Sequence, residues 1–238
     1  ALVSNWLQTT VVMAVPLLLA AMGELLVERT GIINIGVEGT ILVGALAAAI
    51  VAHHSGSPWV AVAAACGAGL LFGATFALVA VLMRGNQVVA GTAMNLIAFG
   101  STGVAYRAAF GVTGAALTVP GFAAMPIPGL AEIPVLGEAL FRQPVLGYVA
   151  FLLGPAAGWL LHRTLPGLGW RMAGENPAAA AAQGVPVRRT RCFAVLLGSL
   201  SAALAGAYLV LAYTHTFVEG MSAGRGFIAL ALVVFSAW

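Results

Sequence analysis

Apolar residues are gathered in seven long runs, and short polar stretches separate the runs. Most runs approach the roughly 20 residues that an α-helix needs to cross about 30 Å of hydrocarbon. They predict an all-α polytopic membrane protein with a single transmembrane domain, residues 1–238. The runs are Trp6–Leu26, Ile33–Val51, Trp59–Met83, Val88–Tyr106, Val145–Leu161, Cys192–Tyr213 and Gly224–Trp238. The last run would reach only about 22 Å, so we expect the chain to be truncated within a helix and further passes to follow.

The composition indicates that lipid is the main solvent. Hydrophobic residues make up 61% of the chain and charged residues 7%, whereas a soluble domain carries about a quarter charged residues. The 10 basic side chains form no cluster large enough to neutralise a phosphate backbone, which excludes nucleic acid as a partner. Cys66 and Cys192 lie within apolar runs, and neither predicts a disulfide or a metal site.

The arginines predict the orientation of the chain. If the N-terminus lies outside, most arginines fall on the inner side, in agreement with the positive-inside rule. The inner group is Arg29, Arg84, Arg163, Arg171, Arg188, Arg189 and Arg191, and the outer group is Arg107, Arg142 and Arg225. The loop of residues 164–190 is then cytoplasmic. The connection of residues 108–143 is external, and its apolar character predicts short helices on the outer face.

Small residues predict where helices pack closely. Gly69–Gly73 and Gly154–Gly158 are GxxxG pairs, and Gly198–Ala202 is a pair of small residues at the same spacing. Such pairs let two backbones approach in lipid, where the hydrophobic effect does not drive helices together. They predict a compact helical bundle.

A few polar residues stand out as candidates for the path of a solute. Asn34 and Glu38 are four residues apart and share one helical face. Glu38 either bonds to a neighbouring helix or arginine, or lines the path, since an ionisable group in a membrane is costly to bury. Asn95 either bonds across helices or holds a polar solute, together with Phe99 one turn further on.

A second acidic site precedes the last run. Val218-Glu219-Gly220 repeats Val37-Glu38-Gly39, and the two following runs point in opposite directions, which predicts an inverted internal repeat. Glu219 and Arg225 are expected to pair, either for structure or as a gate or docking contact. The glutamates are expected near the membrane interfaces, which argues against ion coupling at mid-membrane.

One short helix is predicted on the cytoplasmic side. Asn176 is a good N-cap, and Pro177 suits the first helical position because its missing N–H is not needed there. Gly184 suits the position after the helix. The helix of residues 177–183 is marginal in water unless it docks. It is either an ordered loop or a contact for a cytoplasmic partner.

Four blocks carry a resemblance to a known family: ERTGIINIGVEGTILVGAL, NQVVAGTAMNLIA, GENPAAAAAQGVPV and EGMSAGRGFIALALVVF. They resemble the permease subunits of bacterial ABC importers for nucleosides and simple sugars, a ribose-type family related to branched-chain amino acid permeases. The resemblance implies the type II importer fold of the vitamin B12 importer's permease, in the bacterial inner membrane. The GENP block resembles the coupling helix that docks on the ATPase. The residues implied in this coupling are Gly174, Glu175, Asn176, Pro177, Ala180, Gln183 and Gly184.

The resemblance also implies the function and the partners. The chain would import a small polar solute by alternating access, with a nucleoside as the favoured solute and a simple sugar or riboflavin as alternatives. Its partners would be a cytoplasmic ABC ATPase, a second permease subunit, identical or homologous, and an external solute-binding protein. ATP and Mg would bind to the ATPase and no cofactor to this chain, which has no GxxxxGK[ST] pattern and no catalytic motif. An ion-coupled secondary transporter is the alternative from another class. The substitution Ala180→Arg is expected to block transport and to leave the membrane fold intact.

Overall fold

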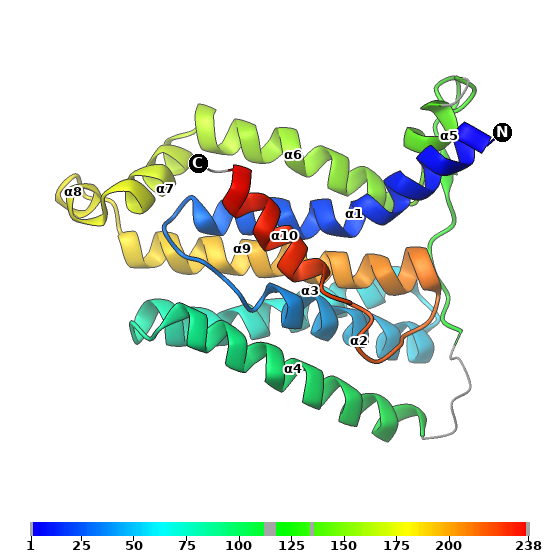
Figure 1. Cartoon of the computed structure of the whole chain (residues 1–238), viewed down its shortest axis with the longest axis horizontal. Coiled ribbons are helices and arrows are strands. Elements are labelled where there is room, and N and C mark those ends of the chain that lie inside the picture. Colours follow the sequence, from blue (N-terminus) through cyan, green and yellow to red (C-terminus); the bar gives the residue numbers. More distant parts are fainter. Residues whose placement is uncertain (1, 112–117, 134–135, 237–238) are drawn as a thin grey trace.

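The computed structural model describes residues 2–111, 118–133 and 136–236, and nearly all of its regular structure is helical (Figure 1). Six helices in this part are long and apolar enough to cross a membrane, which confirms the first six runs. They are α1 (Leu2–Glu28), α2 (Val37–Ser55), α3 (Pro58–Ala77) continued by η1 (Leu78–Leu82), α4 (Gln87–Phe110), α6 (Val145–Arg163), and α9 (Val187–Tyr208) continued by η2 (Leu209–Thr214).

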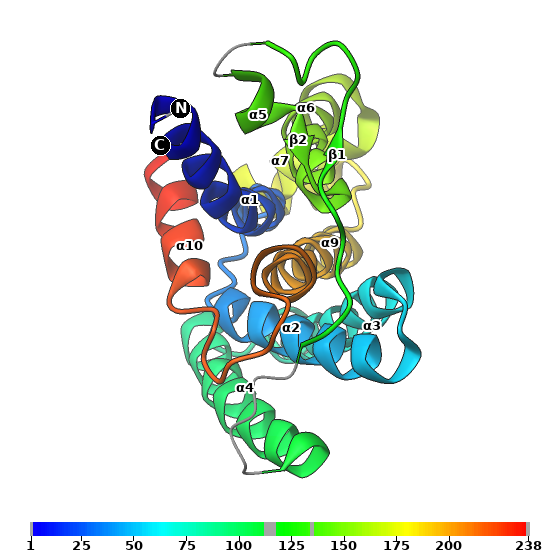
Figure 2. The same ribbon diagram turned by 90° about the vertical axis from the view of Figure 1, so that its right-hand side faces the viewer.

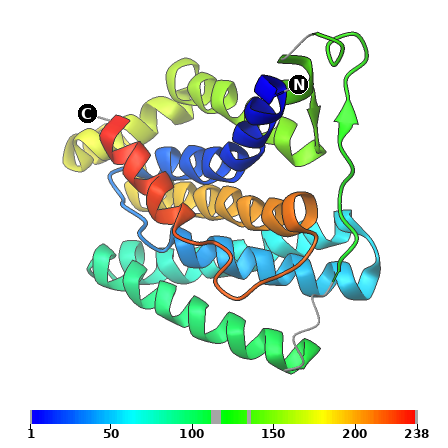
Figure 3. The ribbon, with the colours of Figure 1, turned by 45° about the vertical axis from the view of Figure 1, so that its right-hand side comes forward.

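The seventh run forms a shorter helix, α10 (Arg225–Ser236). Its 12 residues reach only about 18 Å. α10 begins inside the bundle and runs toward the end where α7 and α8 lie (Figures 1 and 3). The last two residues of this run, 237–238, lie outside the described residues.

α9 is the central helix, and α1, α2 and α3 pack against it (Figure 2). Gly44 of α2 and Gly69 of α3 both face Ala203 of α9. A Cβ added at Gly44 would lie 2.7 Å from the Ala203 Cα, and one added at Gly69 would lie 2.3 Å from the Ala203 Cβ. These approaches leave no room for a side chain. The predicted role of the Gly69–Gly73 pair is therefore confirmed.

Two other predicted helix contacts have different outcomes. Gly198 of α9 packs against Gly23 of α1, where an added Cβ would lie 2.9 Å from the Gly23 carbonyl oxygen. Gly154 and Gly158 of α6 face open space, with no described atom within 4 Å of an added Cβ. The predicted packing contact at Gly154–Gly158 is therefore wrong, because the spacing of two glycines does not require that another helix faces them.

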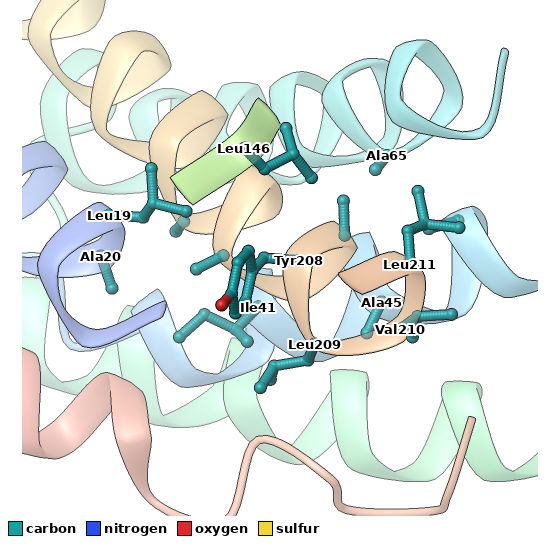
Figure 4. Packing of buried hydrophobic residues seen from close by; sticks show 14 of the residues in the cluster. Leu19, Ala20, Ile41, Ala45, Ala65, Leu146, Tyr208, Leu209, Val210 and Leu211 are labelled. Carbon is teal, nitrogen blue, oxygen red and sulfur yellow. The ribbon is translucent and has the colours of Figure 1, made fainter. Parts of the chain in front are cut away.

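The main apolar core surrounds the C-terminal half of α9 and the start of η2. Tyr208 is the largest fully buried side chain and lies beside Ile41 of α2 (Figure 4). Leu19 of α1 and Leu146 of α6 belong to the same cluster. In lipid this packing stabilises the bundle through close van der Waals contact rather than through removal of apolar surface from water.

The described parts of the connection, residues 118–133 and 136–143, lie at the end of the bundle that also holds the start of α1 (Figure 1). They contain one short helix, α5 (Leu136–Leu140), and two short antiparallel strands, β1 (Met125–Pro126) and β2 (Arg142–Gln143). The expectation of short helices is thus met by α5 alone, and residues 112–117 and 134–135 lie outside the described residues. The backbone N–H of Phe122 donates to the Leu211 carbonyl (2.7 Å), which ties this connection to η2.

Two short helices, α7 (Leu165–Glu175) and α8 (Pro177–Ala182), lie at the opposite end (Figure 1). Six of the seven arginines that were predicted to lie inside line two cavities at this end. These arginines are Arg29 and Arg171 in one cavity and Arg84, Arg188, Arg189 and Arg191 in the other. The predicted gathering of the inner arginines at one end is confirmed for these six.

Candidate functional site

The chain turns back into the bundle between α1 and α2. Residues 29–36 are not helical, and α2 begins only at Val37, part of the way along the bundle (Figure 1). Gly44 lies level with Ala203, which is well inside the span Val187–Thr214. The start of α2 is about 10 Å from this level, at about 1.5 Å per residue. A non-helical backbone at such a depth needs hydrogen-bond partners, because hydrocarbon supplies none.

Glu24 and Asn34 supply part of these partners. Glu24 of α1 is buried, and its Oε1 accepts from the backbone N–H of Asn34 (2.8 Å). The Asn34 Oδ1 accepts in turn from the N–H of Gly36 (3.0 Å). The Asn34 side chain therefore fixes the turn that starts α2.

Asn95 of α4 supplies two further hydrogen-bond partners for this backbone. Its Nδ2 donates to the Ile35 carbonyl (2.9 Å), and its Oδ1 accepts from the Gly39 N–H (2.8 Å). One amide thus holds the end of the non-helical segment and the first turn of α2 against α4. Only 5% of Asn95 is exposed, compared with 43% of Phe99. The Asn95 amide is thus engaged by backbone groups, and the role of Asn95 and Phe99 as a pair that holds a solute stays a prediction.

Glu38 joins α2 to α10. Only 1% of this residue is exposed. Its Oε1 accepts from the N–H of Gly224 (2.8 Å) and its Oε2 from the N–H of Gly226 (2.6 Å). A carboxylate at a helix N-terminus is favourable because it satisfies free N–H groups and faces the positive end of the helix dipole. Glu38, in the first turn of α2, therefore caps the N-terminus of α10.

Glu24 and Glu38 are both buried in the bundle, and the expectation that the glutamates stay near the interfaces is wrong for Glu38. The error came from treating residue 33 onward as a helix that starts at the membrane surface. The polar atoms of Asn34, Glu38 and Asn95 bond to backbone groups across elements. Their participation in a solute path stays a prediction.

The predicted pair of Glu219 and Arg225 does not form. Glu219 instead makes a two-pronged ion pair with Arg107 at the end of α4, with both N–O distances at 2.9 Å. Arg225 donates to the carbonyls of Met221 and Ser222, and it lies at the start of α10, not at the outer surface. Its predicted external position is therefore wrong.

Glu219 and Glu38 occupy different environments. Glu219 is in an exposed loop before α10 begins, whereas Glu38 is inside the first turn of α2. The match between Val218-Glu219-Gly220 and Val37-Glu38-Gly39 is therefore not a match of structural positions. Arg107 lowers the pKa of the Glu219 carboxyl, mainly through its side-chain hydrogen bond and also through its positive charge.

α8 has well-defined ends. The Asn176 Oδ1 accepts from the Ala179 N–H (3.0 Å), as predicted for an N-cap. At the other end Gly184 has a φ of +85°, and the Val185 N–H donates to the Ala180 carbonyl (3.0 Å). This is a Schellman closure, in which a left-handed residue ends the helix. α8 ends at Ala182, one residue before the predicted end.

Two residues implied in coupling to the ATPase are not on the free surface of α8. Ala180 is fully buried against the rest of the chain. Gly174 packs against the backbone of Arg29, where an added Cβ would lie 2.5 Å from the Arg29 carbonyl oxygen. Ala180→Arg would therefore disturb the local fold around α8, and its expected lack of effect on the membrane fold stays a prediction. The exposed coupling candidates are Glu175, Asn176, Pro177, Gln183 and Gly184.

Arg191 connects α7 to the non-helical segment. Its Nε donates to the Thr30 carbonyl (2.9 Å) and its Nη2 to the Ala173 carbonyl (3.2 Å). Gly31 and Gly174 pack against each other beside this bridge. The chain thus has a continuous contact from α8 through α7 to the segment that carries Asn34 and leads to Glu38.

The sequence analysis missed Glu24, Gln87 and the bridging role of Arg191. Glu24 had a usable signal, because it is a carboxylate within an otherwise apolar run. Gln87, whose Oε1 accepts from the Ile33 N–H (2.9 Å), had no comparable signal since it follows the N-cap of α4.

Residues 7–238 match a family model described as the permease component of the branched-chain amino acid transport system. The chain belongs to this permease family. The permease is 39% identical over 236 residues to a putative glucose ABC transporter permease protein of Haloferax volcanii, which covers 98% of this chain and 70% of the relative. It is 33% identical to a guanosine ABC transporter permease protein of Bacillus subtilis (96% of this chain, 74% of the relative) and 33% identical to a nucleoside ABC transporter permease protein of Lactococcus lactis (94% and 72%).

These findings confirm the family resemblance, which rested on four blocks of sequence. The permease is a multi-pass protein of the cell's inner membrane and a subunit of an ABC transporter, and an ion-coupled carrier gains no support. No solved structure matches the chain. The vitamin B12 importer type of fold and the inverted repeat therefore stay predictions.

Proposed function

We propose that this permease imports a nucleoside, driven by ATP hydrolysis on a separate subunit. Two relatives that align over most of the chain are a guanosine and a nucleoside ABC transporter permease. Together with the family match, these relatives are the observation that carries the proposal. A simple sugar is the second candidate, because the relative from Haloferax volcanii is a putative glucose permease.

The ATPase partner would dock on α8. This helix projects from the end of the bundle that carries most of the arginines (Figure 1), and it presents Ala178, Ala179, Ala181 and Ala182 as exposed residues. A helix of six residues is marginal alone, so its fixed ends and its buried Ala180 hold it in place before a partner arrives. ATP and Mg would be bound by that partner, and this chain would bind no cofactor.

The other proposed partners follow from the same class of importer. A second permease subunit, identical or homologous, would complete the path of the solute. An external solute-binding protein would deliver the solute at the end of the bundle that carries α5. In this arrangement the bridge from α8 through Arg191 to residues 30–36 carries the motion of the ATPase to α2 and α10.

The substrate is tested with the proposed solute-binding partner of this permease. Isothermal titration with guanosine, adenosine, ribose, glucose and riboflavin should give tight binding of a nucleoside and none of riboflavin. In membrane vesicles that contain the whole importer, nucleosides should likewise be taken up and riboflavin should not. Tight binding and uptake of glucose, with no response to nucleosides, would overturn the nucleoside proposal in favour of the sugar candidate.

The coupling role is tested with arginine substitutions on the exposed face of α8. Ala178→Arg and Ala182→Arg are one helical turn apart and leave the buried Ala180 in place. Each should abolish co-purification of the ATPase and reduce uptake at least tenfold, while the thermal stability of the permease stays unchanged. His162→Arg adds the same side chain at the inner end of α6 and should have no effect. Normal ATPase binding by both α8 variants would reject docking on α8.

A further inference from the structure

A basic groove lies beside α8, between the start of α9 and the turn that joins η1 to α4. It has a volume of about 710 Å³, in the range of ligand-binding pockets. Four arginines line it, namely Arg84, Arg188, Arg189 and Arg191, while Pro177 and Ala181 of α8 form part of its wall. None of the seven glutamates, all of which lie in the described part of the chain, lines this groove.

Three of these arginines differ from Arg191 in their contacts within the described part of the chain. Arg191 donates to the Thr30 and Ala173 carbonyls, as described above. Within residues 2–111, 118–133 and 136–236, no side-chain hydrogen bond or ion pair satisfies Arg84, Arg188 or Arg189. The neighbouring cavity differs, because there Arg29 and Arg171 are accompanied by Glu28 and Glu175. The groove therefore has an excess of positive charge without an internal counter-ion.

The arginines lie at the depth of lipid headgroups. Arg84 comes two residues after the apolar span that ends at Leu82, and Arg188 and Arg189 are in the first turn of the span that begins at Val187. Exposed apolar side chains flank them, including Met83 and Val88. An amphiphile with a negative head and apolar chains matches this combination of groups.

We propose that this groove binds the headgroup of an anionic phospholipid from the inner leaflet. Arginine forms two parallel hydrogen bonds to a phosphate, and basic pockets between transmembrane helices on the cytoplasmic side hold acidic headgroups. The acyl chains would lie along the exposed apolar residues beside Arg84. An acidic protein segment would satisfy the arginines as well, but it would leave that apolar surface uncovered. The proposal requires only that the helices span the membrane, and it does not depend on the coupling role of α8.

The backbone at Arg84 supports a specific site. Arg84 has a φ of +57°, a conformation that non-glycine residues rarely adopt. This turn directs the chain from η1 into α4 and places Arg84 on the same groove as the first turn of α9. Arginine at such a position is held by its surroundings at some cost in strain.

The test measures phospholipid binding to the purified full-length permease by native mass spectrometry. Phosphatidylglycerol and phosphatidylcholine with the same acyl chains are added to the delipidated protein. We expect phosphatidylglycerol to bind at least tenfold more tightly. The triple variant R84Q/R188Q/R189Q should lose roughly 100-fold in affinity for phosphatidylglycerol, since each basic residue near an anionic lipid contributes roughly fivefold.

A matched variant controls for the loss of charge. R29Q/R163Q/R171Q removes three arginines from the same side of the membrane and should bind phosphatidylglycerol within about threefold of the natural protein. If the glutamine triple variant does not fold, R84K/R188K/R189K keeps the charge and the orientation, and it should lose affinity by up to tenfold as the paired hydrogen bonds are lost.

Three results would overturn the proposal. The first is equal binding of the two lipids by the natural protein. The second is the same loss of affinity in the groove variant and the matched variant. The third is loss of ATPase co-purification by the groove variant with no change in lipid affinity, which would make the groove a protein contact.

Discussion

The contact between Glu38 and α10 gives the most direct test of the arrangement inside the bundle. Glu38→Ala removes a buried carboxylate that accepts two backbone hydrogen bonds, at 2.8 and 2.6 Å. A hydrogen bond to a charged group contributes about 1.5–3 kcal/mol. The two N–H groups that remain, those of Gly224 and Gly226, find no water at this depth. The free energy that holds α10 in place should therefore fall by about 3–6 kcal/mol.

Hydrogen–deuterium exchange measures this attachment locally. In Glu38→Ala the amides of α10 should exchange at least 100-fold faster, because about 3 kcal/mol corresponds to roughly that factor, while α3 stays protected. Glu38→Gln keeps one acceptor oxygen and should show a smaller increase. Glu219→Gln is the matched control, since Glu219 is exposed and does not touch α10 helix amides. Exchange of α10 that is unchanged in Glu38→Ala would refute the reasoning.

Three further predictions concern other parts of the molecule. Gly206→Ala would place a Cβ 2.0 Å from the Ile41 carbonyl oxygen. The overpacking should cost about 1–3 kcal/mol and lower the midpoint of thermal unfolding in detergent by several degrees. The control Gly158→Ala, which faces open space, should leave this midpoint unchanged or raise it. Arg107 lowers the pKa of Glu219 in the fold, so their ion pair stabilises the protein fully above the usual carboxyl pKa of about 4.3, and this stabilisation is lost as the pH falls through the lowered pKa. The difference in unfolding free energy between the natural protein and Glu219→Gln should therefore shrink to zero in acid. A difference that grows in acid would contradict this. Arg191→Gln removes the bridge between α7 and residue 30 and should reduce uptake about tenfold, while the ATPase still co-purifies. The measured quantity is the ratio of solute transported to ATP hydrolysed, and the control Arg163→Gln should keep the ratio of the natural protein. An unchanged ratio in Arg191→Gln would show that the bridge is not used.

The elements that the sequence predicted well are those determined by local information. Six helices follow from long apolar runs, because only a helix satisfies its own backbone in lipid. The start of α8 follows from Asn176 and Pro177, since an N-cap acts within three residues. The family was recognisable for a similar reason, because its blocks are contiguous.

The errors concern contacts between distant parts of the chain. The depth of Glu38 depends on the return of residues 29–36 into the bundle, and its partners lie 186 and 188 residues away. Arg107 was an equally distant partner for Glu219, and the nearer Arg225 was an attractive but wrong choice. Ala180 illustrates a different limit, because a helix made of alanines has no polar side that shows which face is buried.

The long separations in these contacts also bear on how the protein is made. The N–H groups of Ile33 and Gly39 obtain their side-chain partners from Gln87 and Asn95, which are synthesised 54 and 56 residues later. Glu38 obtains its partners only when Gly224 and Gly226 have been added. The first two helices therefore enter the membrane with an incomplete set of hydrogen bonds, and a nascent chain that stops before α10 holds a carboxylate in the bilayer with nothing to bind. Completion of this region therefore waits for a segment that is synthesised 186 to 188 residues after Glu38.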